Sequence, residues 1–235
     1  MELEWLGNSS FRIDIGDTTF VTDPAYDEDP NAPVAAGDVE YADFVLVTHG
    51  HPDHASDAVA VARASNAPIV AVAELAVELE QRGDGVETIV RNPSSPRDLG
   101  TGVEVGLVEM DHSSSVGLSE GEARYAGVPC GFVLDDGDQV VFHAGDTALC
   151  ANLKVVGEVY DPDVAMLPIS GGFVTDEQEA GIAADWVDAD AAIPMHYDSS
   201  EAIPDADPRA FAASVEERTP GTEPIVLDQG ETVEL

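Results

Sequence analysis

The sequence predicts a single α/β domain over residues 1–235, with two β-sheets and helices outside them. Its 235 residues suit one domain of ordinary to large size or two small ones, and no long linker or low-complexity block divides them. Strands come first, strands and helices then alternate, and a second strand-rich set lies in the middle of the chain. A chain of this length buries a substantial core without disulfides.

Alternating or continuous apolar residues predict the strands. In chain order they are 3–6, 11–15, 18–22, 44–48, 69–72, 86–90, 103–110, 129–134, 139–142, 163–167, 191–194, 225–227 and 232–235. Gly16–Asp17 and 135–138 are expected to close two hairpins. Residues 23–40 contain three prolines and many acids, which predicts a long loop, and long loops in compact domains are often functional.

Amphipathic or Ala-rich segments predict five helices. They are 53–64, 74–82, 153–159, 177–187 and 208–217, and Gly83 is expected to end the second of them.

The charge of the chain argues against nucleic acids and anionic membranes as partners. It carries 47 acidic and 9 basic side chains, a net charge of −38. Nucleic-acid binders gain affinity from basic side chains on phosphates, and anionic membranes attract basic segments, so neither partner is expected. The acids are spread from Glu2 to Glu234, and Lys154 is the single lysine. Such a surface repels itself in dilute buffer and is screened at molar salt, which predicts a protein from an extreme halophile.

The two cysteines and the lack of a recognisable targeting signal favour a cytoplasmic protein. Cys130 and Cys150 form neither a CxxC pair nor a disulfide framework, so a thiolate metal site is not expected. The N-terminus has no apolar signal region, and no stretch approaches 18 apolar residues, so we expect neither export nor a membrane span.

Histidines carry the chemistry. Three of the six fall within six residues, in the segment Thr48-His49-Gly50-His51-Pro52-Asp53-His54, directly after a predicted strand and before a predicted helix. Imidazole and carboxylate suit Zn, Mn, Fe or Ni, and this spacing lets several converge on one point. Further candidates follow predicted strands downstream, where open α/β sheets usually place their sites. They are His112, Asp146 and His196.

This pattern of H-x-H-x-D-H, then His, then Asp in a Gly-Asp-Thr context, then His, resembles the metallo-β-lactamase superfamily. The nearest resemblance is to its small single-domain metal-dependent hydrolases, related to L-ascorbate-6-phosphate lactonase. The segments that carry it are 7–15, 48–54, 142–149, 163–172 and 193–197. The resemblance covers essentially the whole chain and implies an αββα sandwich with metals at one edge of the two sheets.

The resemblance also implies a ligand set for two divalent ions. His49, His51 and His112 would hold the first ion; Asp53, His54 and His196 the second; Asp146 would bridge both. Zn²⁺ is the expected ion, with Mn²⁺ as the alternative because the related lactonase depends on manganese. A metal-bridging hydroxide would then cleave an ester, lactone or phosphodiester bond of a small molecule.

Asp23 and His143 near this ligand set, and Asp53 within it, have further expected roles, and one position departs from the family pattern. Asp23 resembles an early aspartate that supports the ligands, and Asn8 stands where related sequences often have His. Asp53 and His143 are the candidate catalytic residues. His143 has two interpretations: a site partner or proton donor near the leaving group, or a strand-end histidine packed beneath the site.

Other functions fit the same fold less well. A superfamily nuclease usually carries extra insertions and basic surfaces, although molar salt weakens the charge objection. A flavodiiron-type oxidoreductase has Glu where this chain has His51, and a non-catalytic domain would lack ligands. A glyoxalase-type thioesterase needs a helical C-terminal domain, whereas 39 residues follow His196. A secreted β-lactamase needs an export signal. The expected partner is a small-molecule substrate, and a homo-oligomer is left open.

Overall fold

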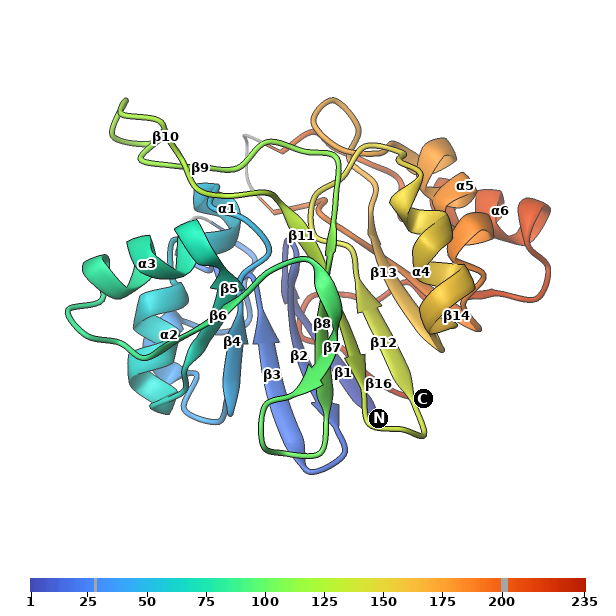
Figure 1. Cartoon of the computed structure of the whole chain (residues 1–235). Helices are drawn as coiled ribbons and strands as arrows, with labels where there is room; N and C mark the ends of the chain where they lie inside the picture. Colours follow the sequence, from blue (N-terminus) through green and yellow to red (C-terminus); the bar gives the residue numbers. More distant parts are fainter. Residues whose placement is uncertain (28, 200–202) are drawn as a thin grey trace.

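Two seven-stranded sheets face each other, and helices cover the outer side of each (Figure 1). The computed structural model describes residues 1–27, 29–199 and 203–235, so residue 28 of the predicted loop 23–40 lies outside the described part. This layering confirms the αββα architecture that the resemblance implied. None of the described helices is long and apolar enough to cross a membrane.

The first sheet has the strand order β16-β1-β2-β3-β4-β5-β6. Its strands are β1 (Glu2–Gly7), β2 (Ser10–Ile15), β3 (Thr18–Thr22), β4 (Phe44–Leu46), β5 (Ile69–Val72), β6 (Thr88–Arg91) and β16 (Thr232–Glu234). The first three form antiparallel hairpins, whereas β3 to β6 run parallel. The C-terminal strand returns to the sheet, because β16 pairs with β1.

The second sheet has the order β15-β14-β13-β12-β11-β8-β7. Its strands are β7 (Ser94–Asp98), β8 (Glu104–Glu109), β11 (Cys130–Asp135), β12 (Val140–His143), β13 (Val164–Pro168), β14 (Ala191–Met195) and β15 (Glu223–Pro224). Strands β12 to β15 run parallel, so their carboxyl ends meet at one edge. A small hairpin of β9 (Ser115–Val116) and β10 (Arg124–Tyr125) follows β8.

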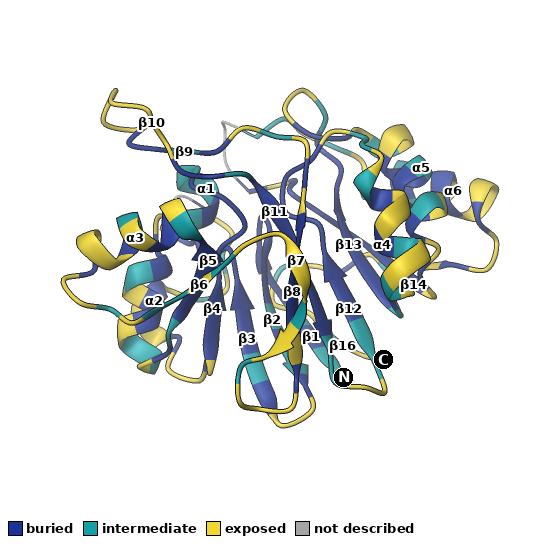
Figure 2. Cartoon of the chain, in the orientation of Figure 1, coloured by how far each residue is buried: buried dark blue, intermediate teal, exposed yellow. Residues whose placement is uncertain are grey.

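Each sheet has its own helical layer. The first is covered by α1 (Pro52–Ala55), α2 (Ala58–Ser65) and α3 (Ala73–Arg82), and the second by α4 (Asn152–Tyr160), α5 (Glu177–Val187) and α6 (Pro208–Arg218). A short 3₁₀ turn, η1, spans Ala36–Asp38. The strands are mostly buried and the helices expose their outer faces (Figure 2). Phe11 and Phe20 of the first sheet share one apolar core with Phe132 and Phe142 of the second.

The structure corrects three local predictions and adds three strands. The predicted strand 225–227 is wrong, because β15 ends at Pro224. The predicted helix 53–64 is two helices, because the N–H of Asp57 donates to the carbonyl of Pro24 rather than to that of Asp53 four residues earlier. The strand expected at 86–90 begins two residues later, and β7, β9 and β10 were not expected.

Candidate metal centre

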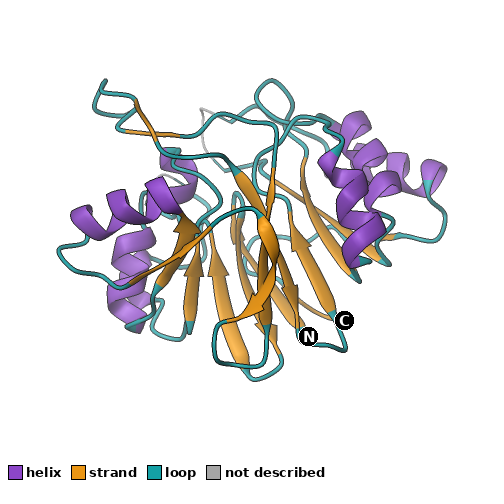
Figure 3. Ribbon diagram, viewed as in Figure 1, coloured by secondary structure: helices purple, strands orange, loops and turns teal. Residues whose placement is uncertain are grey.

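The loop between β4 and α1 brings the first four candidate residues together. His49 and His51 lie in the loop, and Asp53 and His54 lie in the first turn of α1. Pro52 occupies the first turn of that helix, where its fixed backbone angle and missing N–H suit a helix start. Loops gather at the end of the sheets opposite the two chain termini (Figure 3), and α1 lies at that end.

The other three candidates follow strands of the second sheet. His112 comes after β8, Asp146 after β12 and His196 directly after β14. Gly145 has a φ of 60°, and a Cβ there would lie 2.8 Å from Cβ of Thr48, so the two loops approach closely only with glycine. His196 has a φ of 61°, and its N–H donates to the carbonyl of Asn8 over 3.0 Å.

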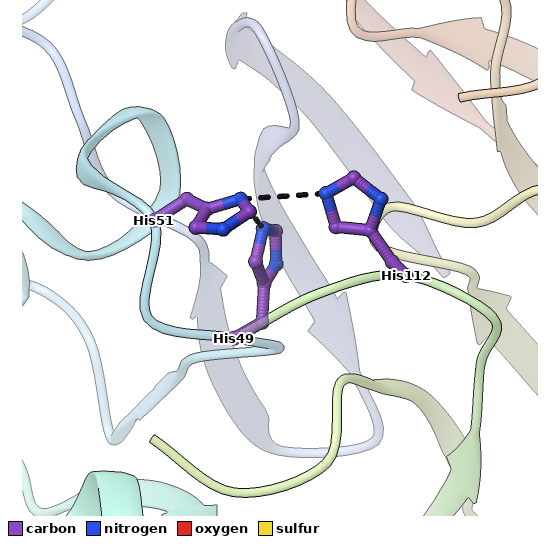
Figure 4. A group of neighbouring side chains, drawn as sticks. All are labelled: His49, His51 and His112. Carbon is purple, nitrogen blue, oxygen red and sulfur yellow. Dashed lines mark hydrogen bonds between the residues drawn. The ribbon is translucent and has the colours of Figure 1, made fainter. Parts of the chain in front are cut away.

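Three histidines form the first cluster. His51 Nδ1 lies 3.0 Å from His49 Nε2 and 3.3 Å from His112 Nε2 (Figure 4). Nitrogens bound tetrahedrally to one Zn²⁺ at about 2.0–2.1 Å would lie roughly 3.3 Å apart. The spacing of these three nitrogens therefore fits a single ion.

Asp53, His54, Asp146 and His196 form the second cluster. His196 Nε2 lies 3.4 Å from Asp53 Oδ2 and 3.2 Å from Asp146 Oδ2, and His54 Nε2 lies 3.2 Å from Asp146 Oδ1. Asp146 also faces the first cluster, since its Oδ2 lies 3.4 Å from His112 Nε2 and 3.8 Å from His49 Nε2. This carboxylate stands between the two groups.

Unpaired buried atoms test whether the residues fit metal ions. His54 Nε2, Asp146 Oδ1 and His196 Nε2 are buried and have no hydrogen-bond partner among the described residues. They lie close together but not in hydrogen-bond geometry. Buried polar atoms without a partner are costly, so a group absent from the polypeptide should satisfy them. A cation between nitrogen and carboxylate donors does so, and the donor set fits a divalent transition metal.

Hydrogen bonds fix the orientation of three rings. Thr48 Oγ1 donates to Asp23 Oδ2 over 2.7 Å, so it accepts from His49 Nδ1 at 3.0 Å and leaves His49 Nε2 free of a proton. His54 Nδ1 donates to the same carboxylate oxygen over 2.8 Å. His196 Nδ1 lies 2.9 Å from Ser170 Oγ. Such contacts orient metal-binding imidazoles and raise their basicity.

The histidines of the two clusters differ in their charge state. Burial, and then the neighbouring His54, lower the pKa of His49 well below its usual value, so its ring is neutral and able to bind a metal. Burial also opposes charge on His54, but the carboxylates of Asp146, Asp53 and Asp23 hold its pKa well above the usual value. The pKa of Asp146 is well below its usual value despite burial, because His196 and His54 face it. The second cluster therefore favours positive charge.

His143 lies beneath the site rather than in it. Its Nε2 donates to the carbonyl of Ser9 over 2.8 Å, and its Nδ1 accepts from the N–H of Gly145 over 3.2 Å. The ring is 1% exposed and does not line the cavity above the clusters. Both nitrogens are thus occupied by backbone groups. This favours the packed-histidine interpretation over a proton donor.

Asn8 and Ser170 are site residues that the sequence pattern did not assign. Asn8 Nδ2 donates to the carbonyl of Asp53 over 3.0 Å, and Asn8 Oδ1 accepts from Ser199 Oγ over 3.0 Å. Asn8 therefore ties the helix turn carrying Asp53 to the loop after β14. The Gly-Asn-Ser segment marked this position, but nothing in the pattern around Ser170 indicated its contact with His196.

A cavity of about 550 Å³ opens above both clusters. His51, His112, Asp53, Asp146 and His196 reach it from the two clusters. Of the three consecutive serines after His112, Ser113 and Ser115 line the cavity, whereas Ser114 Oγ contacts the backbone at Gly50 and Ala126. The candidate metal centre is therefore open to a small molecule.

Comparison with known proteins agrees with this fold and gives its superfamily. The chain matches the beta-lactamase superfamily domain over residues 2–196. It aligns with a metallo-beta-lactamase fold protein of Bacillus subtilis at a TM-score of 0.72 and 14% identity, covering 99% of this chain and 98% of that chain, a likeness of fold alone. Fold and site together define a metal-dependent hydrolase with the metallo-β-lactamase fold.

Two relatives identify the family within this superfamily. A UPF0173 metal-dependent hydrolase of Methanopyrus kandleri is 36% identical over 234 residues, which cover 100% of both chains. The solved structure of a metallo hydrolase from Ignicoccus hospitalis is 31% identical, with a TM-score of 0.87 over 99% of this chain and 97% of that chain. The chain belongs to the UPF0173 metal-dependent hydrolase family. The expectation of a metal-dependent hydrolase is confirmed.

Proposed function

We propose that the enzyme uses two divalent metal ions to hydrolyse an ester, lactone or phosphodiester bond of a small molecule. His49, His51 and His112 would hold one ion, and Asp53, His54 and His196 the other. The position of Asp146 carries the proposal, because its carboxylate lies within 3.8 Å of a nitrogen in each cluster. Zn²⁺ suits this donor set, with Mn²⁺ as the alternative.

When bound, such ions lower the pKa of water toward about 7 and polarise a carbonyl or phosphoryl oxygen. The protein supplies the position of the reacting groups. Asp53 is the partly exposed carboxylate of the centre, with 30% of its side chain open, and it lines the cavity. Although burial opposes its ionisation, His54 and His196 hold the pKa of Asp53 well below its usual value, so it is ionised. A carboxylate of low pKa is a weak base, so Asp53 would hold the second ion through Oδ2 and orient the attacking water by accepting a hydrogen bond from it.

His143 has no such part in the proposal, since backbone groups occupy both of its nitrogens. It supports the loop carrying Asp146 through the N–H of Gly145. We therefore assign it a positioning role and leave Asp53 as the proposed catalytic residue.

A small molecule is the proposed substrate rather than a nucleic acid. The chain has a net charge of −38, and the described residues lining the cavity include no Lys or Arg. Affinity for a phosphate backbone comes mainly from such cations. The same charge disfavours anionic membranes and supports a cytoplasmic, halophilic setting as part of the proposal.

The test is hydrolysis by protein purified in molar KCl and supplied with Zn²⁺ or Mn²⁺. Lactones, carboxylic esters and a phosphodiester are assayed with the wild type, Asp146→Asn and the exposed control Glu216→Gln. We expect metal-dependent hydrolysis of at least one class, a fall of about 10²-fold or more for Asp146→Asn, and no change for the control. The proposal would be contradicted if the wild type were equally active before and after chelation, or if Asp146→Asn were as active as the wild type.

A further inference from the structure

The cavity above the clusters has a mixed lining. Besides the metal-centre residues and Pro52, it includes the serines Ser113, Ser115 and Ser119 and the apolar residues Leu118, Phe173 and Ile203. Its volume of about 550 Å³ lies within the range of small-molecule sites. No described lining residue is Lys or Arg, and the charged or polar side chains of His51, His112, His196, Asp53 and Asp146 belong to the candidate metal centre.

Phe173 is exposed without a structural reason of its own. It is 65% exposed, whereas the other six phenylalanines of the chain are 7% exposed or less. An apolar ring that stays in contact with water gives up the favourable transfer free energy that its burial in the core would provide. Single exposed apolar side chains are common, but Phe173 lines the same cavity as Leu118 and Ile203, and apolar surface that gathers beside polar groups typically marks a ligand site.

The turn that presents Phe173 is fixed at both ends. Gly171 and Gly172 have φ angles of 67° and 69°, which L side chains rarely adopt. Ser170 and Asp176 pair across the base of the turn, and the N–H of Gly171 donates to the carbonyl of Thr175 over 3.0 Å. Ser170 Oγ also contacts His196 Nδ1. The backbone that carries Phe173 is therefore held in a defined position relative to the candidate metal centre.

Leu118 is presented in a similar way from the opposite loop. It is 45% exposed and follows Gly117, whose φ of 79° and contact with the backbone at Glu122 leave no space for a Cβ. The N–H of Gly121 donates to the carbonyl of Leu118 over 3.0 Å. Two constrained turns thus place apolar side chains at one cavity, an arrangement that lowers the entropy lost on binding.

We propose that this cavity binds an uncharged hydrocarbon substituent of the substrate between Leu118, Phe173 and Ile203, with the scissile ester or lactone group over the metal centre. The inference rests on the proposed function. A phosphate or carboxylate on that substituent would be desolvated against apolar side chains with no Lys or Arg in the lining to pair with it. The substrate class is therefore an ester or lactone with an alkyl or aryl substituent, not a phosphorylated one.

Binding of three hydroxamates to the Zn²⁺-loaded protein tests this without requiring turnover. Each head group chelates the metal, and the tails differ: acetohydroxamate has a methyl group, octanohydroxamate a heptyl chain, and suberic monohydroxamate a chain ending in a carboxylate. Calorimetry should show octanohydroxamate binding at least about tenfold tighter than acetohydroxamate. Suberic monohydroxamate, whose tail ends in a carboxylate, should show little of this increase in affinity over acetohydroxamate.

Two variants locate the tail. Phe173→Ala should reduce the gain from the heptyl chain several-fold, whereas Tyr125→Ala, which truncates a 70% exposed aromatic side chain outside the cavity lining, should retain it. Equal affinity for the short, long and carboxylate-tailed compounds, or an unchanged gain in Phe173→Ala, would overturn the inference alone. If none of the three binds although elemental analysis shows bound metal, the proposed function fails and the inference falls with it.

Discussion

Single buried side chains decide whether the candidate ligands point at one another. Asp23 is fully buried, and its carboxylate accepts from the N–H and the hydroxyl of Thr48 and from His54 Nδ1. Three donors thus share two oxygens. Because Thr48 in turn orients His49, one carboxylate controls a ring in each cluster.

Asp23→Asn should therefore weaken metal binding without removing a ligand. The amide would place an N–H group where the carboxylate now meets only donors, which misorients His49 or His54. We expect the affinity for Zn²⁺ to fall about 10–100-fold, measured by competition with a chromophoric chelator. Asp57→Asn is the matched control, since Asp57 is a buried acid whose hydrogen-bond donors among the described residues are the backbone N–H groups of Tyr26 and Asp27. Equal losses in the two variants would contradict this role of Asp23.

The candidate ligands could be found from the sequence because their signal is local. His49, His51 and His54 stand in one short motif, and the others follow apolar strands whose ends meet at one edge. Of the supporting residues, Asp23 was expected only because of the family resemblance, and its contacts with Thr48 and His54 agree with that expectation. The roles of Asn8 and Ser170 could not be found from the sequence, because their contacts are with residues 45 and 26 positions away, respectively, and nothing in their own neighbourhoods encodes those partners.

Among the elements, the β9–β10 hairpin packs directly on the metal-binding loop. A Cβ at Gly50 would lie 2.9 Å from both Ala126 Cβ and Val116 Cγ1. Glycine is therefore required in the middle of the H-x-H segment for close packing, and the hairpin in turn carries Ser115 and leads into Leu118 at the cavity. The motif spacing and the cavity wall depend on the same contact.

Gly50→Ala should push the hairpin away from this loop. Overpacking of this kind typically costs about 1–3 kcal/mol, and we expect that loss in the free energy of urea unfolding. Gly37→Ala is the control, because no atom lies within 4 Å of a Cβ built there and its φ is not positive. A Gly50→Ala protein as stable as Gly37→Ala would show that the hairpin does not pack on the loop.

The elements that the sequence predicted well have a clear apolar pattern. Strand β2 alternates apolar and polar residues, strands β5 and β11 have continuous apolar runs, and helix α5 has apolar and alanine residues at helical spacing. Strand β7 reads Ser-Ser-Pro-Arg-Asp, without alternation, and forms only because it lies at a sheet edge where Pro96 is tolerated. Strand β15 has two residues and is held by its neighbour β14, so its own sequence gave no signal.

Over the whole molecule, the dominant feature is negative charge. The 9 basic side chains cannot neutralise 47 acids, and the arginine ion pairs lie at partly or fully exposed positions, where such pairs contribute little. Net repulsion among the acids therefore opposes folding in dilute buffer. The distribution of acids throughout the chain, rather than in a tail, makes this a property of the folded domain.

Stability should rise steeply with salt even at low concentration. Screening lengths fall from about 30 Å at about 0.01 M to about 10 Å at about 0.1 M and about 3 Å at about 1 M, so repulsion between distant acids is screened first and repulsion between neighbouring acids only toward molar salt. Urea midpoints measured across it in KCl should increase, and they should increase further toward molar salt. A flat or falling midpoint would argue against a fold adapted to high salt.

Metal content per chain tests the central claim most directly. Protein purified in molar KCl and supplied with Zn²⁺ or Mn²⁺ is desalted and analysed for bound elements, alongside His51→Ala, Asp146→Ala and the control Glu216→Ala. We predict about two equivalents of a transition metal in the wild type and control, and a loss in both site variants. No retained metal in the wild type, or two equivalents retained in Asp146→Ala, would contradict a dinuclear centre bridged by that carboxylate.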